Sequence, residues 1–544
     1  MAEPAVATAL IRAIDARWCR SYCCRQTSDV SCPAGSEAEY EGVPVGYVIG
    51  CDLGSQSAKA VLMSPAGALV ATASAPYSMQ HLHSGWAEQD PAVYRSGLAS
   101  SVRSVLASSG VNPAEVSHIG LSSQVDGVVP IDAHQRPLRA AIIWLDRRAT
   151  DQVARLGAAM DSAEIFRRTG LNLDASHTAP KIMWLADTEP ETYRQAASLP
   201  SVGGYAVAWM TGRSIQDHAN SSSTLLYDVV HRGWSDELID AAGLDREKLP
   251  EIGRATDIAG TLTVEAAGVL GLRTTCAVVV STGDDHASCL GAGGVHPGAV
   301  IDIVGTAEPV GVTSRTPVFD ETRLVETHAH AVDGAYLIEN PGFVSGGNTL
   351  WFAKNVLGVS QQEFFDLAGR SDPGARGVRF LPALTGSMAP RWNDAMRGSF
   401  SGLSMNHDSA DLARAIIEGN CFAFRDIYDR LGALGIADSV RVVGGGARSS
   451  LWLRIKATLC ATSIDRVTTE ETSAAGGALL AAVAAGIFPS LEDGVDAVVQ
   501  LHPERVDPDT ADADAYEEAY QDYRALFDAL ETVEAEGPRS DALV

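Results

Sequence analysis

The chain has 544 residues, of which 46% are hydrophobic and 20% charged, proportions typical of a soluble globular protein large enough for two domains. Its 68 acidic residues outnumber 41 basic ones, and the resulting net charge of -27 argues against a nucleic-acid partner. No run approaches the roughly 20 apolar residues of a membrane span, and the start lacks the apolar block of a signal peptide. We therefore expect a cytoplasmic protein with no membrane partner.

The N-terminal segment 1–44 is predicted to be a poorly ordered extension that precedes the folded chain. It holds four of the nine cysteines, namely Cys19, Cys23, Cys24 and Cys32. Their spacing fits no regular paired CxxC pattern, which disfavours a zinc site there. The other five cysteines lie singly in apolar or glycine-rich contexts, which suits reduced core thiols better than disulfides.

Strand and helix patterns follow one another along the chain and then return in the same order. Strand-like runs at 46–53, 58–64 and 68–77, with a turn at 65–67, predict an antiparallel meander. A helix from about 90 to 109 and strands at 117–125 and 127–133 come next.

Beyond residue 296 the strand pattern returns at 298–314, followed by a helix from about 409 to 434 and a strand at 440–447. Glycine turns at 52–55 and 304–307 hold matching places, so we expect two related α/β domains that face each other across a cleft. Periodicity alone leaves open an accidental likeness of two unrelated α/β domains.

The first turn, DLGS at 52–55, ends a buried strand with one carboxylate, Asp52. Gly54 and the small residues after it can present backbone N–H groups to phosphate oxygens. Asp52 can hold a hydrated magnesium ion, which uses few protein carboxylates. Lys59 is either a phosphate contact or a solvated strand residue, and alone a short acidic turn is usually only a turn.

A second carboxylate cluster, STGDDHASCLGAG, follows the apolar strand 276–281. Two adjacent acids, Asp284 and Asp285, at the end of a buried strand are costly unless they are used. The alternative interpretation is a simple helix N-cap, which needs only one acid.

Two glycine-rich segments lie near the C-terminal end of the sequence. VVGGGARSSLW at 442–452 is a strand that ends in three glycines before a helix near Ser450, and such a turn lets a ligand approach the backbone closely. TTEETSAAGGALLAAVAAG at 468–486 predicts a helix on which a planar ligand or another backbone can pack. A close helix contact is its ordinary explanation.

Taken together, these stretches resemble the FGGY family of carbohydrate kinases, most closely its xylulokinase-like members, over residues 46–530. The matching stretches are CDLGSQSAK, SGWAEQDP, IGLSSQVDGVVPIDAHQRPLRAAIIWLDRRA, TAPKIMWL, STGDDHASCLGAG, LPALTGSMAPRWN, ARAIIEGNCFAFRD and GGGARSSLW. The resemblance implies an α/β fold of two ribonuclease-H-like domains of the actin and sugar-kinase superfamily, facing each other across a catalytic cleft. We expect the N-terminal domain at 45–296 and the C-terminal, nucleotide-binding domain at 297–544.

The resemblance also implies roles for single residues, with ATP and Mg2+ as cofactors. Asp284 matches the catalytic base, and Asp52 matches the carboxylate placed for Mg–ATP. The positions implied for ATP binding are Gly54, Ser55, Gln56, Lys59, Gly305, Thr306, Gly444, Gly445, Gly446 and Ser449.

For the acceptor, the resemblance implies contacts from Gln124, Asp126, Trp144, Asp284 and Asp285. Asp126 stands where xylulokinases commonly have His, and Asp285 where they commonly have Asn, whereas glycerol- and tetritol-type kinases resemble this chain in an acid near 126. We expect phosphorylation of a pentulose such as D-xylulose. The alternatives are a tetritol or pentitol kinase, or a catalytically silent sugar- or nucleotide-binding regulatory protein, and a homodimer stays open.

Overall fold

The computed structural model describes residues 46–393 and 395–536. The predicted extension at 1–44, with its four cysteines, lies outside the described residues. Within the described ranges, no helix is both long enough and apolar enough to cross a bilayer.

The first sheet begins with the predicted antiparallel meander of β1 (Tyr47–Leu53), β2 (Ser57–Met63) and β3 (Leu69–Pro76). On the other side of β1 come β5 (Val116–Ser123) and β12 (Ala277–Val279), both parallel to their neighbour. The predicted helix is α2 (Pro91–Ser109), which Asp90 caps with its side chain. Its buried face packs on β2 and β3, and this confirms the sequence prediction for the region.

The predicted strand at 127–133 is wrong, because its backbone forms only isolated bridges. Val128 N donates to Ile142 O, whereas Val129 N donates to Pro200 O and Ile131 N to Ser198 O. Pro130 has no N–H to donate. The segment therefore passes from one hydrogen-bond partner to another and forms no continuous ladder.

The second sheet repeats the connectivity of the first. β14 (Gly298–Ile303), β15 (Ala307–Ser314) and β17 (Tyr336–Val344) are antiparallel neighbours. β20 (Ala437–Val443) and β21 (Ile464–Arg466) then continue in parallel from β14. In both sheets, two antiparallel strand pairs are followed by two parallel pairs in the same order, so the repeat is structural and the accidental interpretation is wrong.

The remaining elements include four separate two-stranded sheets. In the first half they are β4 (Glu88–Gln89), β6 (Ala141–Ile142), α3 (Thr150–Ala159), α4 (Ser162–Thr169), α5 (Thr178–Thr188), α6 (Pro190–Gln195), α7 (Val202–Thr211), β7 (Ile215–Asp217), α8 (His218–Ser222), β8 (Tyr227–Asp228), β9 (Gly233–Trp234), α9 (Asp236–Ala242), β10 (Glu251–Gly253), β11 (Ile258–Thr261), α10 (Val264–Leu270), β13 (Thr282–Gly283) and α11 (Asp284–Gly291). In the second half they are β16 (Glu326–Ala329), α12 (Gly346–Trp351), α13 (Gln361–Ala368), β18 (Arg379–Leu381), β19 (Ser399–Ser401), α14 (Ser409–Ala433), α15 (Ser450–Leu459), α16 (Thr472–Ala484), α17 (Leu491–Val498) and α18 (Ala513–Glu536). The two-stranded sheets pair β4 with β6, β7 with β10, β8 with β9 and β18 with β19.

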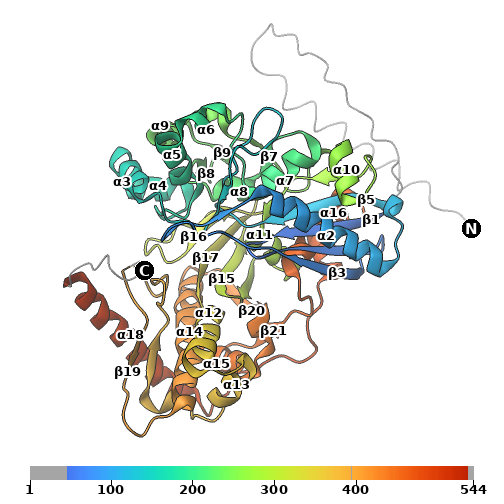
Figure 1. The fold of residues 1–544 in the computed structure, drawn as a ribbon. Helices are drawn as coiled ribbons and strands as arrows, with labels where there is room; N and C mark the ends of the chain where they lie inside the picture. Colours follow the sequence, from blue (N-terminus) through green and yellow to red (C-terminus); the bar gives the residue numbers. More distant parts are fainter. Residues whose placement is uncertain (1–45, 394, 537–544) are drawn as a thin grey trace, which may run out of the picture. The chain divides into compact units, whose positions relative to one another are not determined.

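The Ala- and Gly-rich helix α16 packs directly on the first sheet and on α11. A Cβ added to Gly50 on β1 would lie 2.0 Å from Ala474 O, and one added to Gly120 on β5 would lie 2.1 Å from Gly477 O. Helix and sheet backbones therefore touch, which only glycine allows at these places. Figure 1 shows α16 beside β1 and β5, so the close helix contact explains this segment and no planar ligand is needed.

Candidate active site

Three neighbouring strands end at the same edge of the first sheet and bring carboxylates together there. Asp52 on β1 is paired in register with Ser122 on the parallel strand β5. Ser122 is paired in turn with Thr282 on β13, which leads directly into α11 at Asp284. The carboxyl ends of parallel strands meet at one edge, so residues far apart in sequence share one site.

Asp52 is buried and has few partners for its charge. Ser122 Oγ donates a hydrogen bond of 2.9 Å to Asp52 Oδ1. Burial raises the pKa of Asp52 to about 6, against the opposing effects of Lys59 and of the Ser122 hydrogen bond. The charge of Lys59 is shared between Asp52 and Glu471, because Lys59 Nζ lies 2.6 Å from Glu471 Oε2 at the start of α16.

Asp284 and Asp285 occupy the first turn of α11, and neither is the N-cap. The N-cap is Gly283, without a side-chain hydrogen bond, so the N-cap interpretation is wrong. Burial, then Asp285 and Asp52, raise the pKa of Asp284 well above its ordinary value. Burial, then Asp126 and Asp52, raise the pKa of Asp285 to about 7. Four carboxylates, at 52, 126, 284 and 285, thus lie within electrostatic range of one another.

Asp126 is held in an unusual conformation by neighbours that the sequence analysis missed. Its backbone has φ of +60°, a left-handed geometry that Asp tolerates better than most residues. His177 Nδ1 lies 3.3 Å from Asp126 Oδ1, and Lys181 Nζ donates a 2.7 Å hydrogen bond to Asp126 O. Burial lowers the pKa of His177, but Asp126 and other carboxylates outweigh it and hold that pKa at about 9.

Two predicted acceptor residues make no hydrogen bond to these carboxylates within the described part of the chain. Gln124 Nε2 instead donates a 2.8 Å hydrogen bond to Gln89 Oε1. Trp144 is half-buried in the turn after β6 and makes no ring or hydrogen-bond contact with the carboxylates among the described residues.

The glycine turns of the second domain surround one cavity of about 680 Å³. It is lined by Val304, Gly305, Thr306, Gly346, Leu350, Gln361, Gln362, Phe365, Asp366, Gly445, Gly446, Arg448, Ser449, Ser450, Leu451 and Trp452. Five of the predicted ATP-binding residues are among them. A sixth, Gly444, lies behind the lining with φ of +87° and packs on Val304. A volume of this size is typical of small-molecule and cofactor sites.

A buried ionic group fixes the turn at the floor of this cavity. Lys456 on α15 contacts Asp302 and lies 2.7 Å from Glu308 Oε1, and all three side chains are fully buried. Asp302 and Glu308 belong to the strands on either side of the turn at 304–306, so one lysine ties both strands to the helix that follows the three glycines.

Further polar residues that the sequence analysis missed come from β16 and β17. Glu326, His328 and Glu339 are all buried. Burial raises the pKa of Glu326 to about 7, and it raises the pKa of Glu339 well above its ordinary value with Asp285 as the next cause. The run ETHAH alternates polar with small or apolar residues, a pattern that normally marks a solvent-facing strand, so no local signal indicates their burial.

Two repeated α/β domains, with carboxylates at strand ends in one and a glycine-lined cavity in the other, are typical of two-domain kinases of the actin and sugar-kinase superfamily. Family models for the N-terminal and C-terminal domains of FGGY carbohydrate kinases match residues 47–291 and 302–485. The chain therefore belongs to the FGGY family of carbohydrate kinases, whose cosubstrate is ATP.

Individual relatives support the same family over most of the chain. The xylulose kinase of Escherichia coli (strain K12) is 30% identical over 486 residues, which cover 89% of this chain and 99% of that protein. The glycerol kinase of Nitrobacter hamburgensis is 30% identical over 462 residues, 82% of this chain and 90% of that protein. A crystal structure of a xyloylose kinase from Brucella ovis has a TM-score of 0.82 at 30% identity and covers 90% of this chain and 100% of that one.

Proposed function

We propose that this carbohydrate kinase transfers the γ-phosphoryl group of ATP to a hydroxyl of a small sugar or polyol, with Asp284 as the general base. The observation that carries the proposal is the half-buried pair Asp284 and Asp285 at the start of α11, within electrostatic range of Asp52. An attacking hydroxyl must lose its proton as the bond to phosphorus forms, and a positioned carboxylate accepts it. The raised pKa makes the ionised form of Asp284 a stronger proton acceptor.

We assign the triphosphate to the two glycine turns and the adenosine to the three-glycine turn. In the first domain the assignment covers residues 54–56 and Lys59, whose ammonium group can also contact a phosphate oxygen. In the second domain it covers Gly305 and Thr306 for phosphate and residues 444–446 with Ser449 for adenosine. One cavity is lined both by Gly305 and Thr306 and by residues of the three-glycine turn, and this supports the arrangement in the second domain.

The residues at the end of β1 fit a magnesium ion. Asp52 is buried, accepts one side-chain hydrogen bond, and has a raised pKa, so it is a carboxylate whose charge lacks compensation. Mg2+ uses one or two carboxylates together with substrate phosphates, and this is the donor set that Asp52 and a bound triphosphate offer. When bound there, the ion supplies charge neutralisation at the phosphoryl oxygens.

For the acceptor we propose a pentulose such as D-xylulose, bound by Gln124, Asp126, Trp144 and Asp285. The xylulose kinases among the relatives support this class. A tetritol or pentitol is the second candidate. Asp126 and Asp285 can only accept hydrogen bonds when ionised, which suits hydroxyl-rich ligands, and glycerol kinases match at similar identity.

The test measures ADP release by the purified protein with ATP and Mg2+ across a panel of pentuloses, tetritols and pentitols. We expect one acceptor class to stimulate release and Asp284→Asn to lower turnover by about 100-fold or more. Asp493→Asn is the matched control, because Asp493 is an exposed acid in the first turn of α17, and it should behave like the wild type. Nucleotide binding without transfer to any acceptor would contradict the proposal and favour the silent regulatory protein.

The place assigned to Asp126 has its own test. Asp126→His restores the residue that xylulokinases commonly have, so we expect the ranking of acceptors by kcat/KM to change while the KM for ATP changes little. An unchanged ranking of acceptors would remove Asp126 from the acceptor site.

A further inference from the structure

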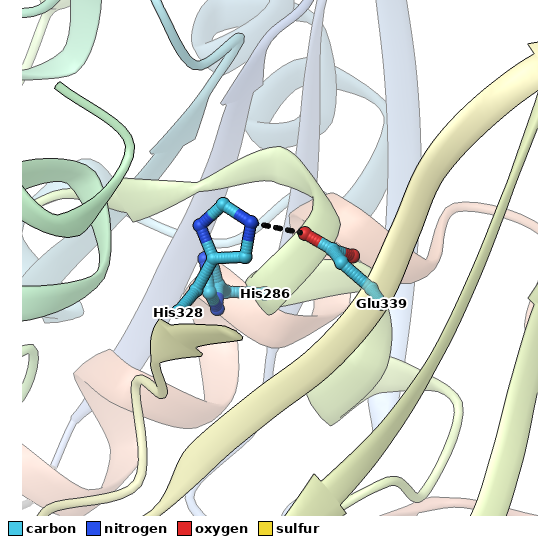
Figure 2. Close-up of side chains that lie close together, drawn as sticks. All are labelled: His286, His328 and Glu339. Carbon is cyan, nitrogen blue, oxygen red and sulfur yellow. Dashed lines mark ion pairs between the residues drawn. The ribbon is translucent and has the colours of Figure 1, made fainter. Parts of the chain in front are cut away.

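We propose that His286, His328 and Glu339 form a binding site for one divalent transition-metal ion of the zinc type, separate from the Mg–ATP site. The three side chains come from α11, β16 and β17 and point toward one another (Figure 2). One ligand atom from each residue can be chosen so that all three lie within 4.8 Å of one another. His328 Nε2 is 3.5 Å from Glu339 Oε1. Tetrahedral zinc spaces its ligand atoms roughly 3.3 Å apart, so small side-chain rotations suffice.

The backbone places these residues on one face by register. Glu326 on β16 lies directly opposite Glu339 on β17. His328 follows Glu326 by two residues, so its side chain leaves β16 on the same face. The first turn of α11 brings His286 against that face, where the rings of His286 and His328 meet edge to face with centroids 5.8 Å apart.

The imidazole nitrogens in the cluster are free to bind a metal. His286 Nδ1 and His328 Nε2 are buried and have no hydrogen-bond partner in the described part of the chain. His328 Nδ1 lies 3.5 Å from Ser223 Oγ, which can accept a hydrogen bond from Nδ1–H and so leave the lone pair of Nε2 free.

Neighbouring His330 differs from these two histidines, because both of its ring nitrogens have partners. Val332 N donates to its Nδ1 at 2.9 Å, and its Nε2 lies 3.3 Å from Thr313 Oγ1. Both nitrogens of His330 are therefore occupied by structural contacts, although its ring is only 5.9 Å from that of His286. A buried imidazole nitrogen without a hydrogen-bond partner is costly, and this cluster has two among the described residues, His286 Nδ1 and His328 Nε2.

The carboxylates around the cluster also favour a bound cation. Glu326 and Glu339 are directly opposite in a buried strand pair, an arrangement that is destabilising for like charges. His177, a basic group of raised pKa whose charge acts on Glu326, already contacts Asp126 and Ser223 O.

The donor set selects the kind of ion. Two imidazole nitrogens and one carboxylate suit zinc and its neighbours, whereas Mg2+ and Ca2+ prefer oxygen ligands throughout. Three protein ligands leave one zinc position open, as in zinc sites that bind a water or a substrate oxygen. An ion there would lie next to Asp285, whose charge acts on Glu339.

The test titrates the full chain, stripped with a chelator, with Zn2+ in a calorimeter and with Co2+ in a spectrophotometer, without ATP or acceptor. We expect saturable binding of one Zn2+ that excess Mg2+ does not displace, visible Co2+ absorption typical of tetrahedral nitrogen and oxygen ligands, and a higher thermal midpoint with Zn2+. Glu339→Gln should weaken this binding by more than about tenfold. That change keeps the side-chain volume and removes a buried negative charge, so the metal-free variant should fold at least as well as the wild type.

His328→Asn and His330→Asn form a matched pair, and only the first should reduce zinc affinity. The exposed residue His296 gives a second control, because His296→Gln should leave affinity unchanged. Zinc held by the N-terminal cysteines would survive Glu339→Gln and would show intense Co2+–thiolate absorption. A wild-type chain without saturable zinc binding, or one whose binding Glu339→Gln and His328→Asn both leave intact, would overturn the proposal. These readouts need no turnover, so the metal site and the kinase proposal stand or fall separately.

Discussion

The substitution Lys456→Met tests the ionic group next to the cavity proposed to hold the nucleotide. Lys456, Asp302 and Glu308 are fully buried, so removing the ammonium group leaves two carboxyl groups without a cation. Burial raises the pKa of Glu308 to about 8, so one of the two carboxyl groups is already protonated at pH 7 in the folded wild type. The folded variant can avoid a buried unpaired charge only by taking up one more proton than the folded wild type holds. Protonating a carboxyl group with an unfolded pKa of about 3.9 costs about 4 kcal/mol at pH 7 and about 1.5 kcal/mol at pH 5.

We therefore expect the free energy of unfolding of Lys456→Met to fall by about 4 kcal/mol at pH 7 and by much less at pH 5. The sign follows from a carboxyl pKa that is higher in the folded variant than in the unfolded chain, so the penalty grows as the pH rises. Urea unfolding of the variant and the wild type at pH 7 and pH 5 measures this change in the free energy of unfolding. The control is Lys354→Met, the same change at an exposed lysine, with an expected effect within about 0.5 kcal/mol. A loss below about 1 kcal/mol at pH 7, or an equal loss at both pH values, would refute the charge argument.

Two further predictions concern the second domain. Burial raises the pKa of the Asp320 carboxylate, but hydrogen bonds from Arg430 and Thr322 outweigh it and hold that pKa below its ordinary value. The resulting stabilisation is present above about pH 4 and is lost as the pH falls through the folded pKa. Asp320→Asn should therefore destabilise by about 3 kcal/mol at pH 7, and its difference from the wild type in urea unfolding should shrink as the pH falls below about 4. Gly446→Ala places a Cβ 2.1 Å from Val304 Cγ1 at the cavity wall and should weaken ATP binding by about tenfold or more in calorimetry; an unchanged ATP affinity would separate this glycine turn from the nucleotide site.

The fold could be predicted from sequence wherever a local pattern determines the structure. The meander at 46–77, the helix α2 and the helix α14 all carry periodicity together with a turn or cap residue, and the structure confirms them. The strand prediction for 127–133 is wrong because the residues alternate as in a strand, while their N–H groups bond to separate places, residue 142 and residues 198–200. A local pattern cannot reveal which distant carbonyl a backbone group will meet.

The close backbone approach at the glycine turns could be predicted for a related reason. A glycine turn carries its own geometry, so Gly444 and Gly446 indicate a close backbone approach from the sequence alone. A close backbone contact of α16 could also be predicted, because a helix of Ala and Gly has side chains too small to keep a neighbouring backbone away.

The side proposed for the acceptor differs, because its charges come from segments that meet only in the folded chain. Asp126 and Asp285 follow strands of the first domain, whereas Glu326 and Glu339 lie opposite each other in the second. No single stretch shows that these two half-buried and two buried acids act on one another, and a region with that much negative charge is stable only with protons or cations in it. The cation that balances this charge, whether His177, a metal ion or a proton, therefore decides the stability of the region.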